Sequence, residues 1–219
     1  YYVNEDGSLL RDGWHELEGM TCYFDASGTS YRNRWFNLND DRYYVDGNGA
    51  RQSGWFSITG TNGSGQRYTN WYHEDANGVL WRNGRREESG KWYFFDANGL
   101  NYRNRWYIDG DGDRYYLDKD GVLQDDGWFK IESTNTTTGA VTENWYYAAE
   151  SGAVLKGGFR ELEDKKYYFD INGLNYRKRW LAEENGKRRY IGDEGYLYQN
   201  QWFVISGLDS RNSDYNNWY

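Results

Sequence analysis

The stretch Tyr31-Arg32-Asn33-Arg34-Trp35 occurs three times, with small changes, in this chain of 219 residues. It returns as Tyr102-Arg103-Asn104-Arg105-Trp106 and again as Tyr176-Arg177-Lys178-Arg179-Trp180, so the steps are 71 and 74 residues. Self-similarity at a nearly fixed period is the sequence signature of a repeat architecture, in which each unit packs only against its neighbours.

A shorter repeat of about 21 residues lies inside the long one. Each short unit begins with a Gly or Arg before a Trp, passes through a polar turn, reaches an aromatic pair and closes with Asp-x-x-Gly. The first full unit shows every part, from Gly13-Trp14 through Tyr23-Phe24-Asp25 to Gly28. The order of units is short, short, long, three times over. The units begin at Gly13, Arg34, Gly54, Gly84, Arg105, Gly127, Gly158, Arg179 and Gln201.

Each unit predicts a β-hairpin, because two aromatic-rich runs flank a polar turn and a glycine closes the unit. No sustained 3.6-residue period supports a helix. A lone hairpin is marginally stable, so neighbouring hairpins must stack. We therefore expect an all-β solenoid of stacked β-hairpin repeats, with three units in each super-repeat. We expect residues 1–219 to form a single binding module that is a piece of a larger protein.

The amino-acid composition and net charge limit the kinds of core and partner that this chain can have. Aromatic residues make up 20% of the chain and there is no proline, so the core must be built largely from rings. The net charge of −8 disfavours a nucleic-acid partner, whose phosphates it would repel. No apolar run is long enough to span a membrane. Cys22 is the only cysteine, so no internal disulfide forms.

Catalysis, metals and cofactors find no support in the sequence. No nucleophile, base and orienting residue recur together, so we expect no enzymatic activity in this segment. His15 and His73 stand at unrelated positions in their units. Asp109–Asp113 resembles the start of a calcium loop, but Arg114 stands where that loop needs glycine, and a tight turn is the better prediction. We expect no metal and no cofactor.

Two aromatic columns run through the second strands of the predicted hairpins. Adjacent strand residues face opposite sides, so one column should pack inward and the other should face a neighbour or solvent; the sequence leaves open which. One column comprises Tyr23, Tyr44, His73, Phe94, Tyr116, Tyr147, Tyr168 and Tyr190. The preceding column comprises Cys22, Tyr43, Tyr72, Tyr93, Tyr115, Tyr146, Tyr167 and Arg189.

The repeated Gly-Trp, followed by an aromatic triplet such as Trp145-Tyr146-Tyr147 and then Ser151-Gly152, resembles the choline-binding or cell-wall-binding repeat of Gram-positive bacteria and their phages. It is also similar to the glucan-binding repeats of glucansucrases and to the carbohydrate-binding repeats of large clostridial toxins. The resemblance covers essentially the whole chain. It implies three hairpins per solenoid turn, so that the long loops at 57–70, 130–144 and 204–217 would stack on one side.

The resemblance also implies ligand sites between consecutive hairpins, where aromatic rings surround a quaternary ammonium by cation–π attraction. Each implied site combines a leading Trp, a ring of the second strand and the next leading Trp. The implied groups are Trp14, Tyr23 and Trp35; Trp35, Tyr44 and Trp55; Trp106, Tyr116 and Trp128; and Trp180, Tyr190 and Trp202. Arg85 and Phe159 replace the leading Trp after the first two long units, and an arginine there opposes a cationic ligand.

The same residues support other interpretations. The rings could stack on sugars, with neighbouring Asn, Asp and Arg as hydrogen-bonding partners, or they could serve only as the core. The arginines of the repeated stretch could simply stack on nearby rings. The long loops are rich in Thr, Asn, Ser and Gly, which suits either a recognition face or solvated hairpin tips.

The leading expectation is a non-catalytic module that attaches a larger secreted protein to the bacterial cell wall. Its partner would be the choline or phosphocholine of teichoic acid, or a polysaccharide, bound through several weak sites acting together. The alternatives are a glucan-binding domain of a glucansucrase-like or toxin-like protein, and an adhesin that binds host glycan or protein through the long loops. Open strand edges at Tyr1 and Tyr219 would allow end-to-end contacts and hence an oligomer.

Overall fold

The protein is built from β-strands, and the computed structural model describes residues 1–208, 210 and 213–219. Among these residues there is no helix, as the repeat pattern predicts. The strands are β1 (Gly13–Leu17), β2 (Met20–Phe24), β3 (Arg34–Leu38), β4 (Asp41–Val45), β5 (Gly54–Thr61), β6 (Arg67–Glu74), β7 (Gly84–Glu88), β8 (Lys91–Phe95), β9 (Arg105–Ile108), β10 (Arg114–Leu117), β11 (Gly127–Thr134), β12 (Val141–Ala148), β13 (Gly158–Leu162), β14 (Lys165–Phe169), β15 (Arg179–Ala182), β16 (Arg188–Ile191), β17 (Val204–Leu208) and β18 (Asp214–Trp218).

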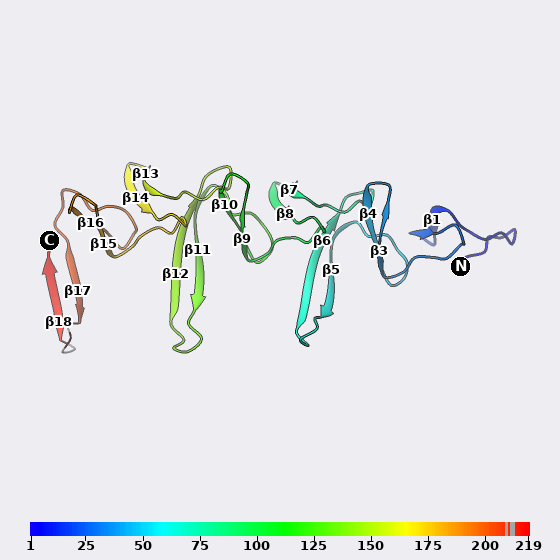
Figure 1. Cartoon of the computed structure of the whole chain (residues 1–219), viewed down its shortest axis with the longest axis horizontal. Coiled ribbons are helices and arrows are strands. Elements are labelled where there is room, and N and C mark those ends of the chain that lie inside the picture. The colour runs from blue at the N-terminus through cyan, green and yellow to red at the C-terminus, as the bar shows by residue number, and fades with distance from the viewer. Residues whose placement is uncertain (209, 211–212) are drawn as a thin grey trace. The chain divides into compact units, whose positions relative to one another are not determined.

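Each odd-numbered strand pairs with the strand that follows it, so the described chain is a series of two-stranded hairpins (Figure 1). The prediction of an all-β chain of hairpin repeats is confirmed. The first eight hairpins begin at the predicted residues. The ninth was predicted to begin at Gln201, but β17 begins at Val204, and backbone hydrogen bonds between Phe203 and Tyr219 extend the pairing by one residue.

The described chain divides into two compact units. The first comprises Tyr1–Tyr107 and Tyr116–Leu123, and the second comprises Ile108–Tyr115 and Gln124–Tyr219. The first unit contains the short hairpins β1–β2, β3–β4 and β7–β8 and the long hairpin β5–β6. The second contains the long hairpins β11–β12 and β17–β18 and the short hairpins β13–β14 and β15–β16.

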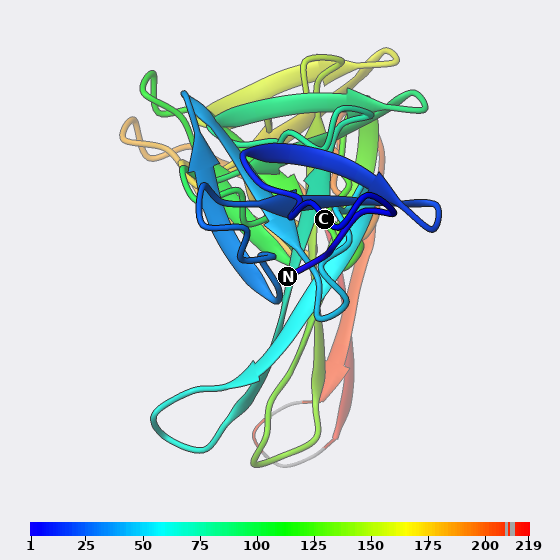
Figure 2. The same ribbon diagram turned by 90° about the vertical axis from the view of Figure 1, so that its right-hand side faces the viewer.

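The predicted long loops are mostly strand. In place of a loop over residues 57–70, β5 continues to Thr61 and β6 resumes at Arg67. Likewise β11 continues to Thr134 and β12 resumes at Val141 in place of a loop over 130–144. Threonine suits a pleated ribbon whose faces are largely solvated, so a polar sequence here extends the hairpin. Figure 2 shows β5–β6 reaching well beyond the short hairpins of its unit. The third predicted loop, 204–217, includes residues 209, 211 and 212, which lie outside the described residues.

The packing of successive hairpins follows from strand alternation. In β3–β4, Trp35 pairs across the ladder with Tyr44, and Phe36 pairs with Tyr43. Neighbouring strand residues point to opposite sides, so each hairpin has a front face, formed by the leading residue and its partner, and a back face, formed by the next pair. Within each unit, the front face of one hairpin packs on the back face of the following one. The members of both columns are therefore buried or half-buried, with Tyr43 9% and Tyr44 8% exposed.

Backbone hydrogen bonds join successive hairpins. The amide of Arg51, just after β4, donates to the carbonyl of Thr21 in β2, and the amide of Leu80, just after β6, donates to the carbonyl of Arg42 in β4. The amide of Leu197, after β16, donates to Lys166 in β14. The segment that leaves one hairpin thus pairs with the second strand of the hairpin before it. Within each unit, these bonds tie the successive repeats together.

The Asp-x-x-Gly closure works as a side-chain-stabilised turn. Asp25 shows the pattern: its Oδ1 accepts the backbone amides of Ser27 and Thr29, both at 2.9 Å. Gly28 has a φ of +81°, a backbone conformation that favours glycine. The Asp109 turn is built in the same way, since its Oδ1 accepts the amides of Asp111 and Asp113. The prediction of a tight turn at that position is confirmed.

One residue breaks the apolar pattern of the core. The last residue of the second strand is buried and apolar in several hairpins, as with Phe24, Val45 and Phe169, but in β6 it is Glu74, which is fully buried. Its Oε1 accepts the amide of Tyr44 at 2.8 Å, whereas its Oε2 has no hydrogen-bond partner in the described structure. Burial raises the pKa of Glu74 to about 8, because the carboxylate form loses its hydration.

Candidate ligand-binding site

The Trp35 group shows how the predicted sites are assembled. The Trp35 ring lies 4.8 Å from Tyr44, its cross-strand neighbour, 4.9 Å from Tyr72 and 6.1 Å from Phe56, measured between centroids. Tyr44 and Phe56 stack at 5.4 Å with only 9° between their planes. The sequence grouped Trp55 with this pair, but Phe56 takes that place. Trp55 and Phe56 are neighbours on one strand, so Phe56 lies on the back face and Trp55 on the front face.

The Trp14 group follows the same rule. Trp14 lies 5.2 Å from Tyr23, as predicted, and contacts Phe36 at 5.5 Å and Tyr43 at 5.3 Å. Phe36 therefore replaces Trp35 as the third ring. The sequence signal was present, because Phe follows the leading Trp at 36, 56, 129 and 203.

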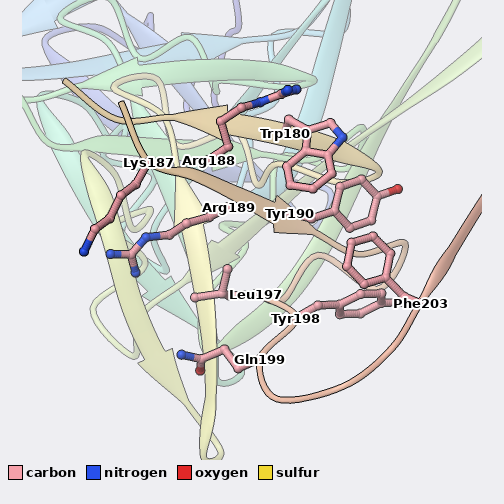
Figure 3. A pocket seen from close by; sticks show the side chains of 9 residues that line it. All are labelled: Trp180, Lys187, Arg188, Arg189, Tyr190, Leu197, Tyr198, Gln199 and Phe203. Carbon is pink, nitrogen blue, oxygen red and sulfur yellow. The ribbon is translucent and has the colours of Figure 1, made fainter. Parts of the chain in front are cut away.

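The Trp180 group belongs to the second unit and is drawn in Figure 3. Trp180 lies 5.1 Å from Tyr190 and 5.3 Å from Tyr219, and Tyr190 stacks on Phe203 at 4.6 Å with 14° between the planes. The predicted third ring, Trp202, is 81% exposed, and Phe203 takes its place in the group. A cavity of about 420 Å³ lies along this group.

Trp55 and Trp128 each form the front face of a long hairpin and have groups of their own. Trp55 contacts His73 at 4.9 Å and Tyr93 at 4.8 Å. Trp128, in the second unit, contacts Tyr147 at 5.3 Å and Tyr167 at 4.9 Å. Of the remaining predicted pair, Trp106 lies 5.1 Å from Tyr116 in the first unit.

The Trp55 group also contains a polar side-chain arrangement. The indole N–H of Trp55 donates to Oε2 of Glu88 at 2.5 Å, and Nε2 of His73 lies 2.9 Å from its Oε1. Trp81 stacks on the His73 ring at 3.7 Å. The Glu88 carboxylate thus holds the rings of Trp55 and His73 in place.

Arginine side chains lie over the leading tryptophans, and only two of them, Arg103 and Arg177, belong to the repeated stretch whose arginines were expected to stack on nearby rings. The guanidinium carbon lies 4.8 to 5.7 Å from the ring centroid in five groups. The pairs are Arg51 over Trp14, Arg42 over Trp35, Arg103 over Trp55, Arg177 over Trp128 and Arg188 over Trp180. The arginines reach the rings from different elements, Arg42 from β4 and Arg51 from the segment after it. Because the arginines stand at different distances in sequence from their tryptophans, no single spacing in the sequence predicts these contacts.

The arginines of the repeated stretch stack on its own tyrosine. Arg34 lies 4.0 Å from the Tyr31 centroid, Arg105 lies 4.5 Å from Tyr102, and Arg179 lies 4.5 Å from Tyr176. The interpretation that these arginines stack on neighbouring rings is confirmed for these three pairs. The residue before each has a left-handed backbone, with φ of +45° at Asn33, which folds the arginine back.

The column tyrosines differ in how their hydroxyls are satisfied. The Tyr44 hydroxyl donates to Oδ1 of Asn33 at 2.7 Å, and the Tyr116 hydroxyl donates to Oδ1 of Asn104 at 2.7 Å. At the third position Lys178 replaces the asparagine, and Tyr190 has no such acceptor. Burial raises the pKa of Tyr44, Tyr116 and Tyr190 alike, so these phenols stay neutral in ordinary buffers.

Comparison with protein families matches three stretches of the chain. Residues 33–50, 86–100 and 104–123 match the cell wall binding repeat of the choline-binding type. In these three stretches the chain is similar to cell wall binding repeats. The matched stretches include β3–β4, most of β7–β8 and β9–β10, and so coincide with the hairpins described above.

Curated relatives of these repeats are glucosyltransferases. The chain is 26% identical over 229 residues to Glucosyltransferase-S of Streptococcus downei, covering all of this chain and 15% of that protein. It is also 26% identical to Glucosyltransferase-S of Streptococcus mutans, covering 92% of this chain and 13% of that protein. The chain therefore spans only a small part of the relatives it matches.

Solved structures share the fold of the repeats. The modular autolysin LytC of Streptococcus pneumoniae matches 98% of this chain and 44% of its own, with a TM-score of 0.57 and 18% identity. CbpF in complex with ipratropium matches 89% of this chain and 62% of its own, with a TM-score of 0.63 and 22% identity. These similarities confirm the predicted repeat solenoid class. Within the described part of the chain, no helix is of a length and hydropathy that could cross a membrane.

Proposed function

We propose that this chain is a non-catalytic module that attaches a larger secreted protein to a carbohydrate polymer at the bacterial cell surface, with an α-glucan as the leading ligand. The chain's extensive match to glucosyltransferases supports a place beside a glucan-handling domain. Residues 1–219 then act as one repeat module. The aromatic groups of successive hairpins supply several similar weak sites, which act together on a repeating polymer.

The observation that carries the choice of ligand is the guanidinium over each of five leading tryptophans. Two unit positive charges about 5 Å apart repel by about 3 kcal/mol at the effective dielectric of a protein surface. Cation–π attraction gains roughly 0.5 to 2 kcal/mol per ring. A quaternary ammonium on the ring face that the arginine covers is therefore disfavoured. A sugar has no charge to repel, and the guanidinium can donate hydrogen bonds to its hydroxyls.

Choline-bearing teichoic acid is the second candidate. It is supported by the match to repeats of the choline-binding type. Under this proposal choline contacts the ring face opposite the arginine. The candidate contacts are then the predicted residues Trp14, Tyr23, Trp35, Tyr44, Trp106, Tyr116, Trp180 and Tyr190. Additional rings would come from Trp55, Trp128 and Trp202.

A paired titration separates the two candidates. Tryptophan fluorescence would be followed while the chain is titrated with an α-1,6-linked glucan oligosaccharide and, in parallel, with choline. The glucan proposal expects a saturable response to the oligosaccharide that Trp180→Ala weakens, and little response to choline. A saturable choline response with no oligosaccharide response would overturn it in favour of teichoic acid. No fluorescence change with either ligand would contradict both candidate functions.

A further inference from the structure

The third copy of the short Arg-Trp hairpin differs in charge from its two counterparts. Residues 178–195 contain five basic and four acidic residues. The counterpart at 33–49 contains two basic and three acidic residues, and that at 104–121 contains three basic and five acidic residues. The third copy is therefore a net-positive hairpin in a chain whose net charge is −8.

The exchanges fall beside the Trp180 group. Cross-strand register aligns Tyr190 with Tyr44, because each pairs with the leading Trp of its hairpin. By the same register, Arg188 stands where Arg42 stands and Lys187 stands where Asp41 stands. Arg189 replaces the aromatic Tyr43. Compared with the first copy, the start of β16 and the residue before it therefore carry more positive charge, while the pairing of Trp180 with Tyr190 is kept.

These basic residues share a cavity with the aromatic group. The residues that line this cavity of about 420 Å³ include Trp180, Tyr190, Lys187, Arg188 and Arg189. Figure 3 shows the rings of Trp180, Tyr190, Tyr198 and Phe203 gathered at one end and the head groups of Lys187 and Arg189 extending at the other. The cavity therefore joins an apolar stacking surface to a basic end.

Part of this positive charge is free of internal carboxylate partners. Arg189 forms an ion pair with Glu183 at 2.5 Å, and Asp193 accepts the hydroxyl of Tyr198 at 2.8 Å. Neither Lys187 nor Arg188 has an ion pair among the described residues, and Arg188 instead lies over Trp180. A second polar cavity beside the group is lined by Lys178, Tyr190 and Asp193. Lys178 there replaces the asparagine that caps Tyr44 in the first unit.

We propose that the Trp180 site binds a glycan bearing an anionic group, with the sugar ring stacked on the aromatic side chains and the anion held by Lys187 at the basic end of the cavity. This inference rests on the proposed carbohydrate-binding function and assigns a charge preference to one site. The shared chemistry is a carboxylate or a phosphate on a sugar. At the Trp35 site, Asp41 beside Arg42 removes the excess positive charge, so a neutral sugar is expected there.

The test compares three probes that differ at one position and in charge: a short α-1,6-glucan oligosaccharide, the same oligosaccharide with C6 of its non-reducing terminal residue oxidised to a carboxylate, and the same oligosaccharide with a phosphate on that terminal C6 hydroxyl. Binding would be measured by calorimetry at low and high salt. We expect an acidic probe to bind about five-fold more tightly than the neutral one at low salt, with the preference shrinking at high salt. The uronic acid and phosphate arms show which anion is preferred.

Two variants carry the same change in charge. Lys187→Asp restores the residue found at the equivalent position of the first two copies, Asp41 and Asp113, so the hairpin is expected to tolerate it. Lys119→Asp makes the same change at a side chain that is 82% exposed and lies in the first unit. We expect Lys187→Asp to abolish the preference for acidic probes and Lys119→Asp to keep it. Lys187→Gln, with thermal unfolding as a check on folding, serves as the milder variant.

Equal binding of neutral and acidic probes by the unaltered protein would overturn the inference while leaving the proposed function intact. Equal loss in Lys187→Asp and Lys119→Asp would overturn it as well, because the preference would then reflect overall charge. Failure of all three probes to bind would instead contradict the carbohydrate-binding function itself.

Discussion

The hydroxyl of Tyr44 donates a 2.7 Å hydrogen bond to the side-chain oxygen of Asn33, a residue held in a left-handed backbone conformation. Tyr44 is 8% exposed, so its hydroxyl depends on this internal acceptor. In the equivalent pair of the third copy, Lys178 cannot accept a hydrogen bond, and the Tyr190 hydroxyl borders a polar cavity. The first copy therefore satisfies its tyrosine hydroxyl with an internal acceptor, whereas Tyr190 of the third copy lines a polar cavity.

This relationship predicts different costs for removing the two hydroxyls. Tyr44→Phe should lower the free energy of unfolding by about 1 kcal/mol, because it removes the part-buried hydrogen bond from the Tyr44 hydroxyl to Asn33. Tyr190→Phe, the matched control, should change stability by less than half of that. Denaturant unfolding of both variants checks the prediction. Equal losses would mean that the hydrogen bond to Asn33 contributes nothing measurable.

Glu74 predicts a pH-dependent stability of the first unit. Its pKa is raised by burial from an ordinary 4.5 to about 8, so the folded state holds a proton that the unfolded chain releases above pH 4.5. The stabilisation is complete below pH 4.5 and is lost as the pH rises towards 8. Besides burial, the backbone amide of Tyr44 and the charge of Arg51 lower the pKa of Glu74, and the charge of Asp75 raises it.

Thermal unfolding at pH 5 and pH 8 should therefore show a lower Tm at the higher pH. Glu74→Gln should flatten this dependence, because the amide cannot ionise. Glu88→Gln is a useful comparison, since Glu88 is bonded to Trp55 and His73 and is partly exposed. A Tm that falls as steeply in Glu74→Gln as in the parent would assign the pH dependence to other groups.

Phe203, and not Trp202, packs in the Trp180 group. Substituting these two neighbouring residues should therefore affect oligosaccharide binding differently. Phe203→Ala should weaken oligosaccharide binding at the Trp180 site several-fold, because Phe203 stacks on Tyr190. Trp202→Ala should leave that binding nearly unchanged, because its side chain is 81% exposed and outside the group. Fluorescence titration of both variants measures this. Greater loss in Trp202→Ala would favour the grouping that the sequence suggested.

The arginine over Trp35 predicts a gain of function toward cations. Arg42→Gln removes the charge from the ring face while keeping a polar side chain of moderate length. We expect a choline response in tryptophan fluorescence that is stronger in this variant than in the parent. Arg34→Gln, which alters an arginine stacked on Tyr31 instead, should not produce it. If the choline response is the same in all three proteins, the guanidinium does not control ligand charge.

The strand positions and repeat order were predictable because two periodic signals reinforce each other. The leading Trp marks where a hairpin begins, and Asp with Gly marks where it closes, so eight of the nine predicted starts coincide with strand starts. The extent of the strands in the long units was harder to predict from the sequence. Thr59 and Thr69 are paired strand residues, yet in sequence they look like loop, because composition does not distinguish a solvated ribbon from a solvated turn.

The grouping of site residues required three-dimensional information. Sequence alignment brought Trp35 and Tyr44 together, since they pair across one hairpin. It placed Trp55 with them because that residue repeats, whereas strand alternation selects Phe56. Arg51 over Trp14 could not be predicted, because the contact joins the first hairpin to the segment after the second, and no spacing rule links them.

The front-to-back packing of hairpins has a consequence for how such a chain responds to mechanical load. Because each repeat is secured only by adjoining repeats, a pulling force can detach a terminal hairpin without disturbing those deeper in the same unit. Rupture should then proceed as a staircase of small events, each releasing one or two dozen residues. A surface anchor built in this way would yield gradually under shear and re-form when the tension is released, while the hairpins still folded keep their hold on the polymer.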